Sequence, residues 1–149
     1  MKMDYDDVIA LFKRKNVDFT ELTAEQTQAY MRDWISQFVP ADSQQKALEV
    51  HCFPSDGIGG FLWHVFSFEI LNSIIGEEAD EAVRNLKRAE CIMFLSIDEI
   101  AFKVSMGSQI EIEDMAALYD VILTDAEYRW TYVKTHEIQC GPYFYSKVL

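Results

Sequence analysis

Residues 91–105, CIMFLSIDEIAFKVS, mark the point where the chain changes from helical to extended patterning. Two short apolar runs, Cys91–Ile97 and Ile100–Ser105, stand on either side of Asp98 and Glu99. Apolar runs of this length are typical of strands, and a short polar break between two of them is typical of a hairpin. The stretch therefore predicts two antiparallel strands.

Further strands are predicted downstream of this hairpin. Val121–Thr124 and Tyr128–Val133 flank residues 125–127 and predict a second hairpin. After a Gly-Pro turn at residues 141–142, Tyr143–Tyr145 predict an edge strand. These segments together predict an antiparallel sheet of four to five strands.

Upstream of residue 91, the apolar residues recur at helical spacing instead. Thr23 and Gln26 have the pattern of a capping box ahead of an apolar helical face. Because the helices mostly precede the strands, we predict a single α+β domain over residues 1–149, with N-terminal helices packed on one face of a C-terminal antiparallel sheet. Helices are predicted over residues 5–15, 23–38, 61–75, 77–89 and 112–119.

The composition is that of one acidic globular domain. Of the 149 residues, 50% are hydrophobic and 13% are aromatic. A folded domain of this size buries about 68–70% of its unfolded surface. The formal net charge is -12, and the acidic residues are distributed along the whole chain. Such a surface repels nucleic acids and anionic membranes, so we expect neither as a partner and favour a basic protein.

Cysteine usage and the N-terminus predict a soluble, cytoplasmic protein. Cys52, Cys91 and Cys140 are widely spaced and include no CxxC pair, which fits a reducing compartment. The N-terminal sequence MKMDYDD lacks the apolar run of a signal peptide. No apolar run reaches the ~18–20 residues of a membrane span, so no membrane segment is expected.

Two aromatic segments contain the candidate pocket residues. These residues are Trp63, His64 and Ser67 in FLWHVFSF (61–68), and Trp130, Tyr132, His136 and Glu137 in WTYVKTHEIQCGPYFY (130–145). If the segments converge, they outline a small-ligand or hydrolase-like pocket in which His64 and Ser67 have the types of a base and a nucleophile. The alternative is that the first segment is a helix buried on several sides and that His64 is packed in the core. No GxSxG elbow and no phosphate-loop motif supports the catalytic interpretation.

The spacing of His136 and Cys140 is the nearest approach to a metal motif. On a helix the two side chains would lie one turn apart and could bind Zn²⁺ with a third ligand from His51, Cys52 or His64. The strand-like run before them and the Gly-Pro pair after them argue against a helix, and HExxC is not the zinc motif HExxH. We therefore predict no metal and no other cofactor.

Tyr143, Phe144 and Tyr145 are a candidate interface. Successive side chains on an extended backbone point to opposite faces, so three consecutive rings cannot all be buried on one face. At least one ring is therefore expected to be exposed or to contact a partner. The alternative is packing of the chain end on the core.

The two aromatic segments resemble a known family. Residues 63–69 resemble a WHxFSYE block, and residues 130–137 with 141–144 resemble a WTYVxTHE…GPYF block. In this order they are similar to short bacterial proteins classified as domain of unknown function four-two-seven-five. Phe68 stands where the block has Tyr, so one hydroxyl is missing from the proposed pocket. The resemblance implies a cytoplasmic bacterial protein and supplies no activity, cofactor or catalytic residue.

Two functions remain open at this point. The charge of -12, the surplus of aromatic residues and the lack of a recognised catalytic set favour a non-catalytic protein-interaction module, comparable to small immunity or antitoxin proteins. The alternative is the small-ligand or hydrolase-like pocket formed by the WHVFS and WTYVKTHE segments. Whether the protein is an enzyme is left open, with a non-catalytic role preferred.

Overall fold

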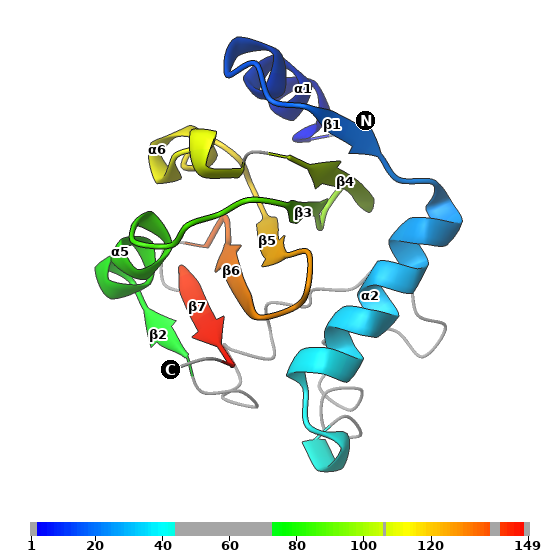
Figure 1. Ribbon diagram of the computed structural model, residues 1–149, viewed down its shortest axis with the longest axis vertical. Coiled ribbons are helices and arrows are strands. Elements are labelled where there is room, and N and C mark those ends of the chain that lie inside the picture. Colours follow the sequence, from blue (N-terminus) through cyan, green and yellow to red (C-terminus); the bar gives the residue numbers. More distant parts are fainter. Residues whose placement is uncertain (1–2, 44–72, 106, 138–140, 148–149) are drawn as a thin grey trace.

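The computed structural model describes residues 3–43, 73–105, 107–137 and 141–147 of the chain. Seven strands form one antiparallel sheet in the order β1-β4-β3-β5-β6-β7-β2 (Figure 1). The strands are β1 (Phe19–Glu21), β2 (Ile74–Ile75), β3 (Cys91–Leu95), β4 (Ile100–Val104), β5 (Val121–Asp125), β6 (Trp130–Lys134) and β7 (Tyr143–Ser146). The helices are α1 (Tyr5–Arg14), α2 (Ala24–Phe38), α5 (Glu77–Arg84) and α6 (Ile112–Met115), with 3₁₀ turns at Ala41–Ser43 and Gly107–Gln109.

The α+β class, the antiparallel sheet and both hairpins are confirmed. The β3–β4 pair is the hairpin predicted from residues 91–105, and β5–β6 is the second one. The sheet is larger than the predicted four to five strands because β1 and β2 contain only three and two residues. Segments this short have no strand periodicity that a sequence can reveal. The prediction that residues 143–145 form an edge strand is wrong, because β2 pairs with the outer side of β7.

Helices cover both faces of the sheet, which corrects the prediction of a single covered face. Phe94 and its cross-strand neighbours Ala101 and Ile122 belong to a row that packs against α2. The adjacent row, which includes Met93 and Leu123, points the other way and packs with α1 and α5. Figure 1 shows α2 on one side of the sheet and α1, α5 and α6 on the other. The central strands are apolar at nearly every position because both of their faces are buried.

Four of the five predicted helices, those over 5–15, 23–38, 77–89 and 112–119, are confirmed in type, but several boundaries move. The capping box of Thr23 and Gln26 is present at the start of α2. Helix α5 ends at Arg84 rather than residue 89, and α6 is only four residues long. Residues 74–75 form strand β2, so the predicted end of the 61–75 helix is wrong, and residues 61–72 of that prediction lie outside the described part. Two β-branched isoleucines before Gly76, whose φ is 74°, favour an extended segment over a helix.

A buried polar network ties α2 to the centre of the sheet. The Tyr30 hydroxyl lies 2.9 Å from Thr124 Oγ1, which lies 3.0 Å from Thr131 Oγ1. The indole N–H of Trp34 donates to the same Thr131 oxygen at 3.1 Å. All four side chains are buried, so each hydroxyl and the indole must find partners inside the protein. The network therefore fixes the position of α2 along the sheet as well as stabilising it.

Replacing Thr131 with valine tests this network. Thr131→Val keeps the β-branched shape but removes the oxygen that accepts from the buried Trp34 N–H. We expect the free energy of unfolding, measured by urea denaturation, to fall by about 1–3 kcal/mol. The control Thr20→Val, on the exposed edge strand β1, is expected to change it by less than about 0.5 kcal/mol. Equal effects of the two substitutions would contradict the role of the network.

Candidate functional site

Three aspartates join four segments at one end of the sheet. The first, Asp98, lies in the turn between β3 and β4 and accepts hydrogen bonds from the backbone amides that begin α1. The distances from its carboxylate oxygens to the amide nitrogens of Met3, Asp4 and Tyr5 are 2.6, 2.8 and 2.9 Å. These amides include the otherwise unsatisfied donors at a helix start, so Asp98 caps α1 from a distant part of the chain.

The second aspartate, Asp4, extends this chain of contacts to the start of β5. Its side chain accepts from the amides of Tyr119 at 2.9 Å and Asp120 at 3.3 Å. Burial raises the pKa of Asp4 above its ordinary value, although these two backbone hydrogen bonds act in the opposite direction. Asp4 is therefore a desolvated carboxyl group that the fold retains for its backbone contacts.

The third aspartate, Asp120, positions His136. Asp120 is fully buried and accepts from the His136 amide at 2.8 Å. Both of its carboxylate oxygens also lie 2.9 Å from His136 Nδ1. An ionised carboxylate can only accept hydrogen bonds, so when Asp120 is ionised the proton shared with His136 is carried by Nδ1. The His136 side chain is 38% exposed, which makes it an oriented and accessible imidazole.

His136 lines a cavity of about 370 Å³ beyond the end of β6. Lys134 also lines this cavity and directs its ammonium group to the backbone carbonyls of Leu118 and Tyr119. Burial lowers the pKa of Lys134, although the charges of Asp120 and Asp4 oppose this. The lining residues are Ala116, Lys134, Thr135, His136, Glu137, Gly141 and Pro142.

Only two of the seven predicted pocket residues are seen to line this cavity, namely His136 and Glu137. Trp130 is buried at the other end of β6. It is six residues from His136, and six residues of extended chain span about 20 Å, so Trp130 is distant from the cavity. Tyr132 is buried on the α5 side, where its hydroxyl donates to Asp80 at 2.7 Å. Burial and this hydrogen bond raise the pKa of Tyr132. Trp63, His64 and Ser67 lie outside the described residues, so their convergence with His136 stays a prediction.

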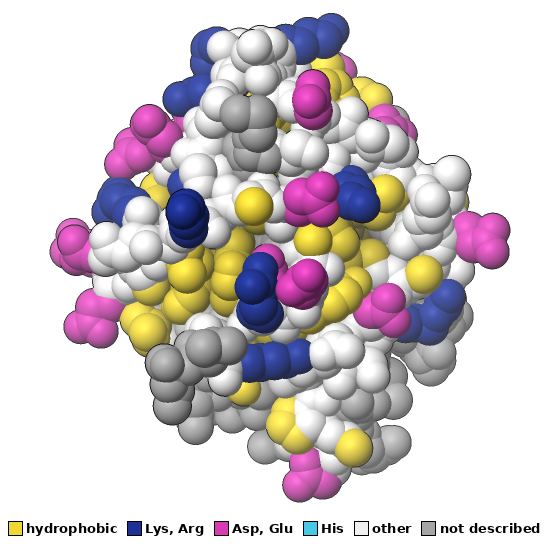
Figure 2. All heavy atoms as spheres, viewed as in Figure 1, with side chains coloured by type: hydrophobic (Ala, Val, Ile, Leu, Met, Phe, Trp, Pro, Cys, Tyr) yellow, Lys and Arg dark blue, Asp and Glu magenta, His cyan; other side chains and the backbone are white. Residues whose placement is uncertain are grey.

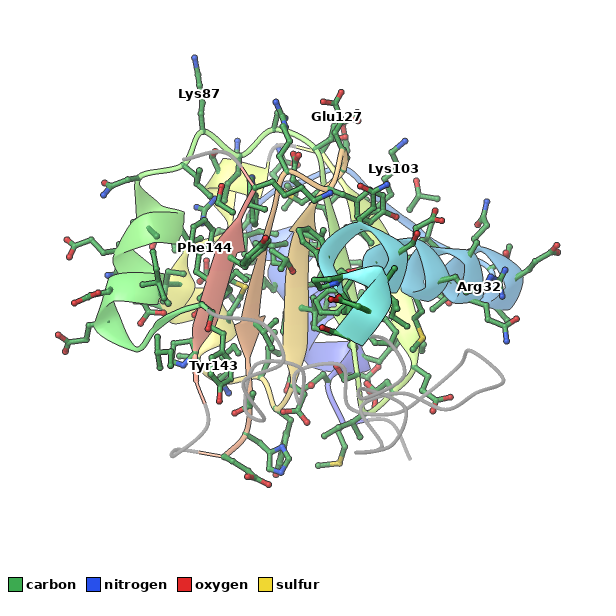
Figure 3. All side chains as sticks on the ribbon, turned by 90° about the horizontal axis from the view of Figure 1, so that it is seen from below. Arg32, Lys87, Lys103, Glu127, Tyr143 and Phe144 are labelled. Atoms are coloured by element: carbon green, nitrogen blue, oxygen red, sulfur yellow. The ribbon has the colours of Figure 1, made fainter. Side chains whose placement is uncertain are left out.

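The predicted interface residues of β7 alternate between the two faces, as an extended strand requires. Tyr143 and Phe144 are both buried, the first in the cluster with α2 and the second in the cluster with α5 (Figure 3). Tyr145 is half-buried, with its ring 6.0 Å from that of Phe38. Their contacts within the chain are thus defined, and a role in binding a partner stays a prediction.

No group of three or more His, Cys, Asp or Glu side chains within the described residues has the arrangement of a metal site. Cys140, the predicted neighbour of His136, lies outside these residues. The one described cysteine, Cys91, is buried in β3, and burial raises its thiol pKa to about 12. It is therefore an inert core residue rather than a thiolate ligand.

The sequence interpretation missed Asp4, Asp98 and Asp120. Each is one of many acidic residues. The partners of Asp98 and Asp4 lie about a hundred positions away along the chain, and that of Asp120 lies sixteen positions away. The one readable signal was an aspartate immediately before the first helix, where a carboxylate is favoured by the helix dipole. Here that aspartate makes no side-chain cap of its own helix and binds amides of another segment instead.

A protein-family model, "Domain of unknown function (DUF4275)", matches residues 6–144. The chain belongs to the DUF4275 family. The matched region contains Asp98, Asp120 and His136, whereas Asp4 lies just before it. Most of the residues that join these segments are therefore within the region shared by DUF4275 proteins. No curated protein and no solved structure is matched. None of the helices described for this DUF4275 protein has the length and apolarity needed to cross a membrane.

Removing the charge of Asp98 tests whether the aspartates hold the corner together. Asp98→Asn keeps the shape of the side chain but replaces one accepting oxygen with an amino group that faces backbone N–H donors. We expect a loss of about 1–3 kcal/mol in the free energy of unfolding. Glu99→Gln, the same change at the exposed neighbouring residue, is expected to cost less than about 0.5 kcal/mol. The free energy of unfolding of both variants is measured by chemical denaturation. Similar losses in Asp98→Asn and Glu99→Gln would contradict the capping role of Asp98.

Proposed function

We propose that this protein is a non-catalytic interaction module that binds a basic protein partner. The contact surface is the corner surface, defined as Met3, Ile97 and Tyr119 with the adjacent His136 and Glu137. Among the described residues, five large apolar side chains are exposed, and three of these five belong to this surface. Their exposed fractions are 39%, 36% and 44%, respectively. Grouped apolar exposure of this kind is a mark of interaction sites, whereas isolated exposed residues are not.

The aspartates join the backbone segments that carry these apolar side chains. The Met3 amide donates to Asp98, the neighbour of Ile97 in the β3–β4 turn. The Tyr119 amide donates to Asp4, and the Tyr119 ring lies 6.1 Å from the His136 ring. The corner surface is therefore built on backbone segments that are fixed by hydrogen bonds. A rigid surface loses less conformational entropy on binding than a flexible one.

The charge at the corner fits a basic partner. Glu99 and Glu137 are exposed beside the apolar side chains, and the ammonium group of Lys134 is occupied by backbone carbonyls. Figure 2 shows acidic and basic side chains interspersed on the face that it draws. An aromatic and apolar centre with an acidic rim is complementary to a partner surface that carries lysine or arginine.

Affinity capture from the source organism's lysate at low salt tests this function. The double variant Ile97→Ser/Tyr119→Ser removes two apolar contacts of the corner surface. The matched control Ile74→Ser/Ile75→Ser removes two exposed isoleucines from β2. We expect a protein rich in lysine and arginine to be retained by the wild type and the control, and to be reduced about tenfold or more with the corner variant. Its retention should fall at high salt, because exposed charges are then screened.

Two outcomes would contradict the proposal. One is that no protein is retained by the wild type. The other is that the retained protein is acidic, or is captured equally by the wild type and the corner variant. Circular dichroism of both double variants confirms that each is folded before capture.

A second candidate function, a small-ligand or hydrolase-like pocket, is favoured by the geometry of Asp120 and His136. A buried carboxylate on Nδ1 of a partly exposed imidazole is the arrangement found around a histidine general base. General-base catalysis contributes about 10²–10⁴-fold. If the pocket hydrolyses esters, His136→Gln should lower turnover of p-nitrophenyl acetate by about a hundredfold or more, and Asp120→Asn should also lower it. Unchanged turnover in His136→Gln would exclude this function.

A further inference from the structure

Arg88 is a buried arginine whose positive charge is poorly compensated. It lies in the segment between α5 and β3 and is only 7% exposed. Its Nη2 donates to the backbone carbonyl of Ile110 at 2.9 Å. Nε and Nη1 are buried and have no hydrogen-bond partner. No carboxylate of the described residues forms an ion pair with it. A guanidinium has five N–H donors, so most of its donor capacity here is unused.

The backbone of Arg88 is held firmly, so the side chain has a defined position. The Arg88 amide donates to Ser108 Oγ at 2.9 Å, and the Ser108 hydroxyl donates back to the Arg88 carbonyl at 2.7 Å. The Ser108 amide donates to that carbonyl as well, at 3.0 Å. These contacts join the α5–β3 segment to the 3₁₀ turn that precedes α6, and Figure 1 shows α5 and α6 on the same side of the sheet.

Burying an unpaired cation is strongly unfavourable unless something else balances it. Burial lowers the pKa of Arg88. Cys91 and then Glu111 act in the opposite direction, and Glu111 forms no ion pair with Arg88. An arginine in this situation is unfavourable for folding alone. Such residues are typical of sites where an anion is bound, because the anion supplies the missing charge and hydrogen-bond acceptors.

A cavity of about 290 Å³ adjoins this side chain. It contains a second guanidinium, that of Arg84, which lies 2.8 Å from Glu113. The charges of Arg84 and Glu113 balance each other, and Arg88 is the cation in the lining without such a partner. The cavity is lined by Arg84, Arg88, Ser108, Glu111, Ile112 and Glu113.

We infer that this cavity binds the oxyanion group of a small ligand, a carboxylate or a phosphate, and that Arg88 is its principal charge partner. A planar guanidinium matches the geometry of both groups and can donate two parallel hydrogen bonds to either. Arg84 makes a secondary contact when it releases the carboxylate of Glu113 and binds the ligand's oxyanion group instead. The site lies on the α5–α6 side of the molecule and is independent of the corner surface and of the function proposed for it.

Anion binding to the purified full-length protein tests the inference. Thermal unfolding and isothermal titration calorimetry are carried out with inorganic phosphate and, separately, with acetate, each against sodium chloride of equal ionic strength. At tenfold excess over Kd, a bound anion should raise the Tm by about 3–6 °C. A response to phosphate alone identifies a phosphate-bearing ligand, and a response to acetate alone identifies a carboxylate-bearing one. No response to either anion beyond that to chloride would overturn the inference.

Arg88→Met is the decisive variant, and Arg32→Met is its control. Arg32 is an exposed arginine on α2, far from the cavity (Figure 3). We expect Arg88→Met to weaken anion binding at least tenfold and Arg32→Met to leave it unchanged. Equal binding by the wild type and Arg88→Met would overturn the inference.

The stability of Arg88→Met without anion separates a binding role from a structural one. If Arg88 is retained for an anion, methionine should leave the Tm unchanged or raise it, because an apolar side chain replaces a buried unpaired charge. If Arg88 is retained to hold the Ile110 carbonyl, the Tm should fall. A large fall, or failure of the variant to fold, would assign a structural role and overturn the inference.

Discussion

The sheet is buried on both faces, and this constraint decides where polar groups can lie. Strands β3 and β5 are covered by α2 on one side and by α1 and α5 on the other, so a polar side chain on either strand must find its partner inside the protein. Thr124 does so through Tyr30 and Thr131, which fixes the position of α2. The one charged residue of these two strands, Asp125, lies at the end of β5, and the turns at the strand ends bring backbone amides together. The ends of the sheet, rather than its faces, are therefore where binding chemistry can be located.

At one such end, the three aspartates replace the hydrophobic contacts that a surface corner lacks. Asp98, Asp4 and Asp120 each accept from backbone amides of a different segment, and hydrogen bonds to a charged acceptor are stronger than neutral ones. These contacts fix the backbone of Met3 and of Tyr119, whose side chains are exposed. A surface of this kind loses little entropy when a partner binds.

The local features of the fold were predictable from the sequence, and the long-range contacts were not. The Thr23–Gln26 capping box and the β3–β4 hairpin depend on neighbouring residues, so their patterns can be read directly. Strand β2 was missed because two isoleucines become a strand only by pairing with β7, nearly seventy positions later. His136 was recognised as a candidate from its residue type. Its partner Asp120 was not, since one aspartate in an acidic chain has no distinguishing local signal.

The corner and the Arg88 cavity differ in how their polar groups are satisfied, and this difference separates two kinds of site. At the corner, the buried carboxylate of Asp120 is paired with both the amide and the ring of His136. At the cavity, Arg88 has two buried nitrogens without partners, so that site is incomplete. Natural proteins accept a local loss of stability mainly where function requires it. An unsatisfied buried cation is therefore a stronger indication of a bound molecule than a well-paired histidine, even though the histidine is the more familiar sign of an active site.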